Sequence, residues 1–131
     1  MDAMLMPLPP VKKRRRRDED LIQKAIVKLW RRVGHPRADL LGIDVGAPAK
    51  LARFRKLAMG AVPGWPDLTM ALPDGRIAFI EVKGPAGVLS PEQREFRARC
   101  ERQGRPWALV RSADEALAVW TEWGATRAAG K

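Results

Sequence analysis

Asp67, Glu81 and Lys83 are the residues of this chain whose types and spacing best suit a chemical task. Asp67 closes the segment Gly64-Trp65-Pro66-Asp67, and the other two lie in Ile80-Glu81-Val82-Lys83 after a short turn. Two carboxylates, with the backbone carbonyl of Val82, would make the all-oxygen site that Mg²⁺ or Mn²⁺ prefers. Such an ion polarises a phosphoryl oxygen and acidifies a bound water, which a nearby lysine can hold or deprotonate. The pattern indicates metal-dependent hydrolysis of a phosphodiester.

The turn between the two segments decides whether these side chains meet. Leu72-Pro73-Asp74-Gly75-Arg76 has the composition of a three-residue hairpin loop that ends in a glycine bulge. If Leu72 pairs with Arg76, Asp67 lies opposite Glu81, and Lys83 shares that face of the sheet. A two-residue loop would turn Asp67 to the other face. The structural alternative is a buried ion pair between Lys83 and one of the acids, which is common for such residues.

The predicted hairpin strands carry apolar residues on both faces. The face away from the acids is wholly apolar, and Phe79 lies on the charged face. This pattern is typical of central strands that are covered on both sides. The residues of the apolar face are Leu68, Met70, Leu72, Ala78, Ile80 and Val82.

Length and charge restrict the class of protein. The chain has 131 residues, enough for one domain, and a formal charge of +10. Six of those charges form the run 12–17, and the remainder is still basic, which favours nucleic acid over an anionic membrane as partner. One cysteine, no membrane-spanning apolar run and no secretory signal predict a soluble intracellular protein. A nuclear location is expected only for a eukaryotic source.

Two basic segments are candidate DNA contacts. Residues 1–17 are predicted to be a flexible basic tail, residues 18–124 the folded domain and residues 125–131 a C-terminal tail. Either basic segment could instead be solvated surface, and the first could be a nuclear address. The candidate residues are Lys12, Lys13, Arg14, Arg15, Arg16 and Arg17 in the tail, and Lys50, Arg53, Arg55 and Lys56 in a basic flap or short helix.

The remaining elements follow from periodicity and caps. Apolar residues at helical spacing predict a helix from Asp18 to Val33, with its acidic start favoured by the helix dipole. A strand is expected near 40–45, then the hairpin, a helix opened by a capping box at 90–93, a strand at 107–110 and a helix capped by Ser112. The order αβββαβα predicts an α/β fold, a mixed central sheet flanked by helices.

Gln93 and Glu19 are expected near the acids. Gln93 shares the one inward stripe of its helix with Phe96 and Cys100, although the capping box alone would explain a glutamine there. Glu19 lies on the edge of the apolar stripe of the first helix, where a solvated role is an equal alternative. His35, in a Gly-His-Pro break, is interpreted as a loop residue.

The constellation resembles the PD-(D/E)XK nuclease superfamily, and more specifically the VRR-NUC (virus-type replication-repair nuclease) domain. The resemblance runs from about Asp18 to Trp120. It is carried by Glu19-x-x-x-Gln23, Gly64-Trp65-Pro66-Asp67, Asp74-Gly75, Ile80-Glu81-Val82-Lys83, Gly87-x-Leu89-Ser90-Pro91-x-Gln93 and Val110-Arg111-Ser112. It implies a restriction-endonuclease-like core, and a place in the cytoplasm of a bacterial or phage-infected cell.

The resemblance also implies roles for single residues. Asp67 and Glu81 would be metal ligands, Lys83 the catalytic lysine and Gln93 the residue that completes the site. Glu19 would contribute an acid from the first helix, through water or a second ion. Where many relatives carry an Asn-Ser-Gly-like segment, this chain has Asp44-Val45-Gly46, so Asp44 is either an extra carboxylate or a simple substitution.

The leading hypothesis is a structure-selective DNA endonuclease that uses Mg²⁺ or Mn²⁺ and no small-molecule cofactor. Small members of the family are similar to Holliday-junction resolvases and act as dimers, whereas members fused to larger proteins, as in the Fanconi-associated nuclease, cut flaps. The alternatives are a flap or other branched-DNA nuclease, a restriction-type or RNA-directed nuclease, and a non-catalytic basic nucleic-acid-binding protein. Trp120 and Trp123 either provide a dimer surface or cover their own core.

Overall fold

The computed structural model describes residues 11–42, 60 and 62–129. Helices and strands follow one another in the order that the sequence predicts, and a short 3-10 helix is added at the end. The elements are α1 (Val11–Val33), β1 (Asp39–Gly42), β2 (Leu68–Ala71), β3 (Ile77–Val82), α3 (Pro91–Gln103), β4 (Trp107–Val110), α4 (Ala113–Glu122) and η2 (Arg127–Ala129).

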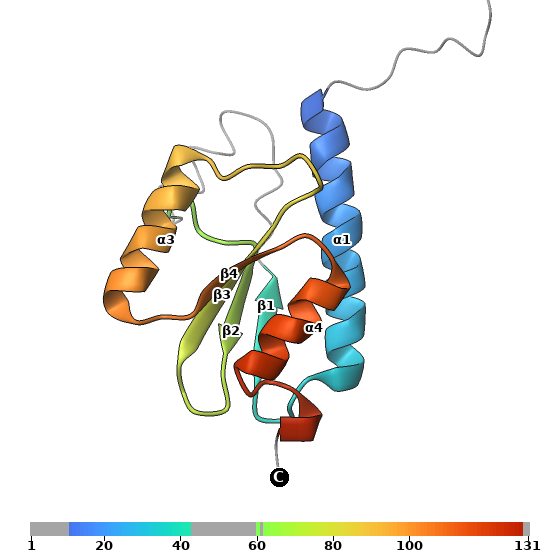
Figure 1. Ribbon diagram of the computed structural model, residues 1–131, viewed down its shortest axis with the longest axis vertical. Helices are drawn as coiled ribbons and strands as arrows, with labels where there is room; N and C mark the ends of the chain where they lie inside the picture. Colours follow the sequence, from blue (N-terminus) through green and yellow to red (C-terminus); the bar gives the residue numbers. More distant parts are fainter. Residues whose placement is uncertain (1–10, 43–59, 61, 130–131) are drawn as a thin grey trace, which may run out of the picture.

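The four described strands form one mixed sheet in the order β1-β2-β3-β4. Pairing is antiparallel from β1 to β3 and parallel between β3 and β4. Helices α1 and α4 cover one face and α3 covers the other (Figure 1). The predicted α/β fold is therefore confirmed.

Each face of the sheet has its own apolar cluster. The larger one joins the predicted apolar face of the hairpin to α1 and α4, where the rings of Trp30 and Trp120 meet edge to face at 5.0 Å. The smaller one lies under α3 and contains Phe79, Phe96 and Cys100. Trp120 is 0% exposed. Of the two roles considered for this tryptophan, covering its own core is confirmed.

Helix α1 begins earlier than predicted. It starts at Val11, so the basic residues 12–17 continue the helix and are not a flexible tail. Asp18, Glu19 and Asp20 therefore lie in its interior, and no acidic residue occupies its first turn. The proposed dipole compensation was wrong because the arginines and lysines of the run are themselves good helix formers.

The end of the chain is also more structured than expected. Ala125 and Thr126 are buried, and Thr126 forms an antiparallel bridge with Gly34. His35 donates its backbone N–H to the Ala125 carbonyl at 2.8 Å. The segment from residue 125, which we predicted to be a tail, is thus packed against the residues that follow the C-terminal end of α1. The predicted strand at 40–45 is found at Asp39–Gly42, and residues 43–45 lie outside the described part.

Candidate active site

The predicted turn and register are present in the hairpin. The Leu72 N–H donates to the Arg76 carbonyl at 2.8 Å, and Gly75 has a left-handed φ of 90°. The register pairs Leu68 with Ile80. One step further along the antiparallel strands places Asp67 opposite Glu81, because paired positions keep a constant sum. The three-residue loop therefore sets the face on which both acids lie.

Asp67 ends the ladder between β2 and β3. Pro66 stands where a residue paired with Val82 would lie, and the Val82 N–H donates instead to Asp67 Oδ2 at 2.8 Å. The N–H and C=O of one residue in a strand point to the same side, so the Val82 carbonyl also faces the Asp67 side. Asp67 thus has one oxygen bound to the backbone and lies beside the predicted carbonyl ligand.

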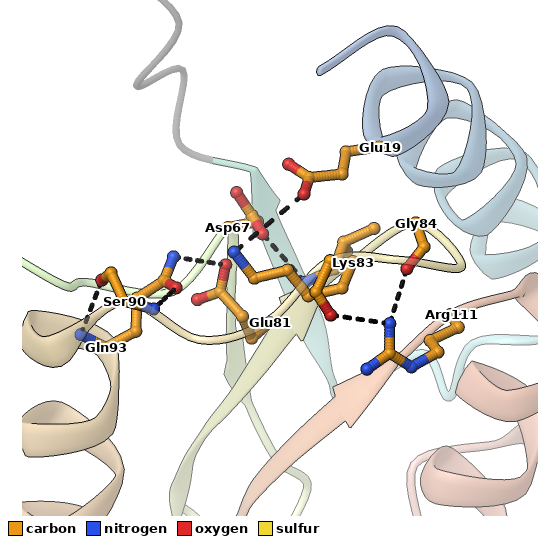
Figure 2. A network of polar contacts seen from close by, with 10 residues as sticks. Glu19, Asp67, Glu81, Lys83, Gly84, Ser90, Gln93 and Arg111 are labelled. Atoms are coloured by element: carbon orange, nitrogen blue, oxygen red, sulfur yellow. Dashed lines mark hydrogen bonds and ion pairs between the residues drawn. The ribbon is translucent and has the colours of Figure 1, made fainter. Parts of the chain in front are cut away.

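Glu81 and Gln93 are joined across the sheet and α3. Glu81 is only 2% exposed, and its Oε1 accepts a hydrogen bond from Gln93 Nε2 at 3.1 Å. The capping box fixes Gln93, because its Oε1 accepts from the Ser90 N–H at 2.8 Å and its own N–H donates to Ser90 Oγ at 3.1 Å. Gln93 is therefore both a member of the capping box and a hydrogen-bond partner of Glu81 (Figure 2).

Glu81 is under strong electrostatic stress. Burial, and then the neighbouring Asp67 carboxylate, raise the pKa of Glu81 to about 10, and Lys83 only partly opposes the rise. The second oxygen, Oε2, is buried without a hydrogen-bond partner. A buried carboxylate that has an unpaired oxygen and lies beside another acid tends to keep its proton, or to bind a cation instead of the proton.

Lys83 reaches the same point from the end of β3. Its Nζ lies 4.0 Å from Glu19 Oε1 of α1, and the residue is 9% exposed. Burial, and to a smaller degree Asp67 and Asp20, raise the pKa of Glu19, whereas Lys83 and Arg15 lower it. The structure thus brings together all five predicted catalytic residues, from α1, α3, β3 and the positions just before β2 and just after β3 (Figure 2).

The donor set fits a hard divalent cation. Asp67, Glu81 and the Val82 carbonyl would hold it, because carboxylate and carbonyl oxygens suit Mg²⁺ and Mn²⁺. Oε2 of Glu81 is buried without a hydrogen-bond partner and could therefore serve as a ligand atom. In the described part of the chain, no three His, Cys, Asp or Glu side chains gather into a metal site by themselves. Water would therefore have to supply the remaining ligands, including any link to Glu19.

The loop before Asp67 packs directly on α3. A Cβ at Gly64 would meet the carbonyl of Glu92 and the N–H of Gln93, and the φ of Gly64 is 79°. Trp65 of the same loop packs edge to face on Phe79 and Phe96 and donates its indole N–H to Thr69 Oγ1 at 2.8 Å. Gly64 therefore lets the Asp67 segment and the Gln93 turn approach each other.

Gly64→Ala is expected to destabilise the protein by about 3 kcal/mol, from left-handed strain plus displacement of α3. Gly75→Ala is the matched control, since Gly75 also has a positive φ but has no atom within 4 Å of its Cβ position. It is expected to cost only about 1 kcal/mol. Urea unfolding followed by tryptophan fluorescence measures both. Equal costs would show that close packing at Gly64 contributes nothing.

The predicted DNA contacts are placed unequally. Arg15, Arg16 and Arg17 are exposed on the N-terminal part of α1, and Arg14 is half-buried. Lys12 and Lys13 lie in the same helix, but their side chains are outside the described part. Lys50, Arg53, Arg55, Lys56 and Asp44 also lie outside the described residues.

Arg111 was not predicted to have a role beyond ending the last strand. Its Nη1 donates to the backbone carbonyls of Gly84 and Gly87, in the loop that follows Lys83 (Figure 2). The signals in the sequence were its place directly after an apolar strand and its part in the Val110-Arg111-Ser112 motif. Neither signal identifies the loop that the arginine holds.

Comparison with known proteins agrees with the geometry. The family model described as the VRR-NUC domain matches residues 17–114. A solved structure described as a VRR_NUC domain protein aligns with a TM-score of 0.61 at 19% sequence identity, over 81% of this chain and 87% of that chain. A second, described as a VRR_NUC domain, has a TM-score of 0.55 at 20% identity, over 81% and 97% of the two chains. A search of curated proteins gave no match. At these identities the likeness concerns the fold alone.

Proposed function

The chain belongs to the VRR-NUC domain family, and from this premise we propose that it is a metal-dependent endonuclease that cleaves branched DNA in the manner of a Holliday-junction resolvase. The family match supports a nuclease-type domain in general terms. The observation that supports metal-dependent cleavage is the pair of acids, Asp67 and Glu81, set opposite each other with Lys83 beside them. The branched substrate rests on the resemblance to small members of the family.

The proposed roles follow from the contacts. Asp67, Glu81 and the Val82 carbonyl would hold Mg²⁺ or Mn²⁺, and the ion would supply polarisation of the scissile phosphate and a more acidic water. Gln93 fixes one oxygen of Glu81 and leaves the other free. Lys83 orients the attacking water, takes its proton or offsets the charge that develops on the phosphate. Glu19 keeps the lysine ammonium near the acids.

A panel of DNA substrates tests this proposal. Four-way junction, flap, linear duplex and single strand, each labelled on one strand, are offered with Mg²⁺ or Mn²⁺, and the cuts are mapped. Paired symmetric cuts across the junction, made by a species that sedimentation shows to be a dimer, are the expected result, because two matched sites need two-fold symmetry. Flap-only cutting selects the flap nuclease, and binding without cutting under either ion selects the non-catalytic DNA-binding protein.

The exposed arginines of α1 are proposed to grip the DNA backbone near the site. The ion pairs among the described residues do not include Arg15, Arg16 or Arg17, so their charges remain available to phosphates. They lie on the helix that carries Glu19 to the site, and this end of α1 extends beyond the sheet (Figure 1). A rigid helix would hold the bound strand at a fixed distance from Lys83.

Changing Arg15, Arg16 and Arg17 together to glutamine, which keeps helix propensity, is expected to weaken junction binding about 10-fold or more at 100 mM salt. The slope of log affinity against log salt should become shallower by about 2 to 3, while kcat at saturating DNA stays unchanged. Fluorescence anisotropy with Ca²⁺ in place of Mg²⁺ measures the affinity.

The matched control removes three charges from the other end of the same helix, by changing Lys28, Arg31 and Arg32 to glutamine. All three are exposed. The control is expected to lower affinity much less than the first variant. An equal loss would mean that DNA responds to net charge alone and that the N-terminal end of α1 has no special place.

A further inference from the structure

Arg111 links two loops that flank the site. Its backbone N–H donates to Glu115 Oε1 at 2.9 Å, in the capped first turn of α4, which fixes the arginine on its own loop. Its Nη1 then donates to the carbonyl of Gly84 and, at 3.0 Å, to that of Gly87. One guanidinium nitrogen therefore holds both ends of the turn that leaves β3.

The turn held by Arg111 forms one wall around the Lys83 side chain. The Gly87 N–H donates to the Gly84 carbonyl at 3.1 Å, so the turn folds back on itself. A Cβ at Gly87 would lie 3.1 Å from Lys83 Cδ and 3.3 Å from its Cβ. On its other side, the same position is 3.5 Å from Glu19 Oε1. The turn is thus packed against the stem of the lysine and beside its ion-pair partner.

Arg111 itself does not join the acids. Figure 2 shows its guanidinium next to Gly84, while the Lys83 side chain extends the other way toward Asp67 and Glu19. The backbone of Lys83 is already fixed by its N–H bond to the Val110 carbonyl at 3.0 Å. What the arginine adds is therefore the position of the turn, and through the turn the direction of the lysine side chain.

We propose that Arg111 is a positioning residue, which holds the Gly84–Gly87 turn against Lys83 so that the lysine Nζ stays at the metal-binding acids. This inference rests on the proposed nuclease function. It predicts that loss of the arginine lowers the rate of the chemical step and leaves DNA binding unchanged. An arginine has donors in a planar fork that can serve two carbonyls together, whereas glutamine has a shorter and weaker pair.

Arg111→Gln is expected to lower kcat about 10- to 100-fold with KM and the Ca²⁺-supported DNA affinity within about 2-fold of the parent, as for misplacement of a catalytic group. Arg111→Lys keeps the charge and one donor group and is expected to recover part of the loss. Arg105→Gln is the matched control, because Arg105 is exposed and lies just before the N-terminal end of β4, whereas Arg111 follows its C-terminal end. It should leave kcat unchanged.

Gly87→Ala tests the same contact from the other side. The added methyl is expected to push the lysine stem aside and lower kcat to a similar extent, without loss of DNA affinity. Combined with Arg111→Gln, it should lower kcat by much less than the product of the two single effects, because both act through one lysine. Circular dichroism and thermal melts identify variants that fail to fold, and Arg111→Lys then carries the test.

The outcomes separate this inference from the proposed function. No cleavage by the parent protein would remove the nuclease proposal itself. Cleavage by the parent with parental kcat in both Arg111→Gln and Gly87→Ala overturns the positioning role alone. A loss of DNA affinity in Arg111→Gln that matches the loss of kcat/KM also overturns it, since the arginine would then contact the substrate directly.

Discussion

Lys83→Ala is expected to lower DNA cleavage about 1,000-fold while Ca²⁺-supported DNA binding stays near the parental value. The lysine is buried beside Glu19 and is proposed to act in the chemical step, whereas the exposed arginines of α1 are proposed to contribute to affinity. Single-turnover cleavage of a labelled junction gives the rate, and anisotropy gives the affinity. Lys24→Ala, which removes an exposed lysine from α1, is the control.

Asp67→Asn tests the other half of the site. Asparagine keeps an oxygen that can accept the Val82 N–H, so the end of the strand pair should survive while one ligand charge is lost. A loss of cleavage comparable to that of Lys83→Ala, with an unchanged melting temperature, is expected. If both variants cleave at the parental rate, the acid and lysine cluster is a structural ion pair and the proposed active site is wrong.

Glu81→Gln is expected to stabilise the metal-free protein above neutral pH. The pKa of Glu81 is raised from its ordinary value near 4.5 to about 10 in the folded state. Between these values the folded protein keeps a proton that the unfolded chain releases, so parental stability falls as the pH rises through this window. Glutamine mimics the protonated acid and removes the penalty.

Without metal at pH 8, the free energy of unfolding of the variant should exceed that of the parent by about 2 kcal/mol, and its melting temperature should be roughly 5–10 °C higher. At pH 4 the two proteins should have almost the same stability. Thermal melts in EDTA across pH 4 to 9 measure this. Added Mg²⁺ should raise the parental melting temperature but not that of the variant, because binding to the folded state stabilises it. Glu95→Gln is the control, because Glu95 is an exposed residue of α3. Parallel pH curves for parent and variant would mean that Glu81 is ionised in the fold.

The site was predictable because its geometry depends on short-range chemistry. The Pro73-Asp74-Gly75 loop specifies one register, and that register alone brings Asp67 opposite Glu81. The capping box at Ser90 likewise fixes the position of Gln93, whose side chain then reaches Glu81. Such features are local, so a single sequence is sufficient to predict them.

The parts that escaped prediction depend on contacts distant in sequence or on weak preferences. The start of α1 was misplaced because a run of like charges predicts disorder by repulsion as readily as helix by propensity. The bridge of Thr126 to Gly34 joins the segment that follows α1 to the end of the described chain, two positions far apart in sequence. Arg111 contacts a loop more than twenty residues away, and no spacing rule links them.

Among the described residues, no helix is long and apolar enough to cross a bilayer.

Helix α1 carries Arg15 to Arg17 and Glu19 on one continuous rod. Each residue of an α-helix advances about 1.5 Å and turns about 100°. The angle about the helix axis between the proposed DNA-contact arginines and Glu19 is therefore fixed by the number of residues between them. A one-residue insertion between Arg17 and Glu19 would swing the arginines to another side of the helix while preserving every charge. Homologous chains that use this grip should therefore vary in length before the arginines and not after them.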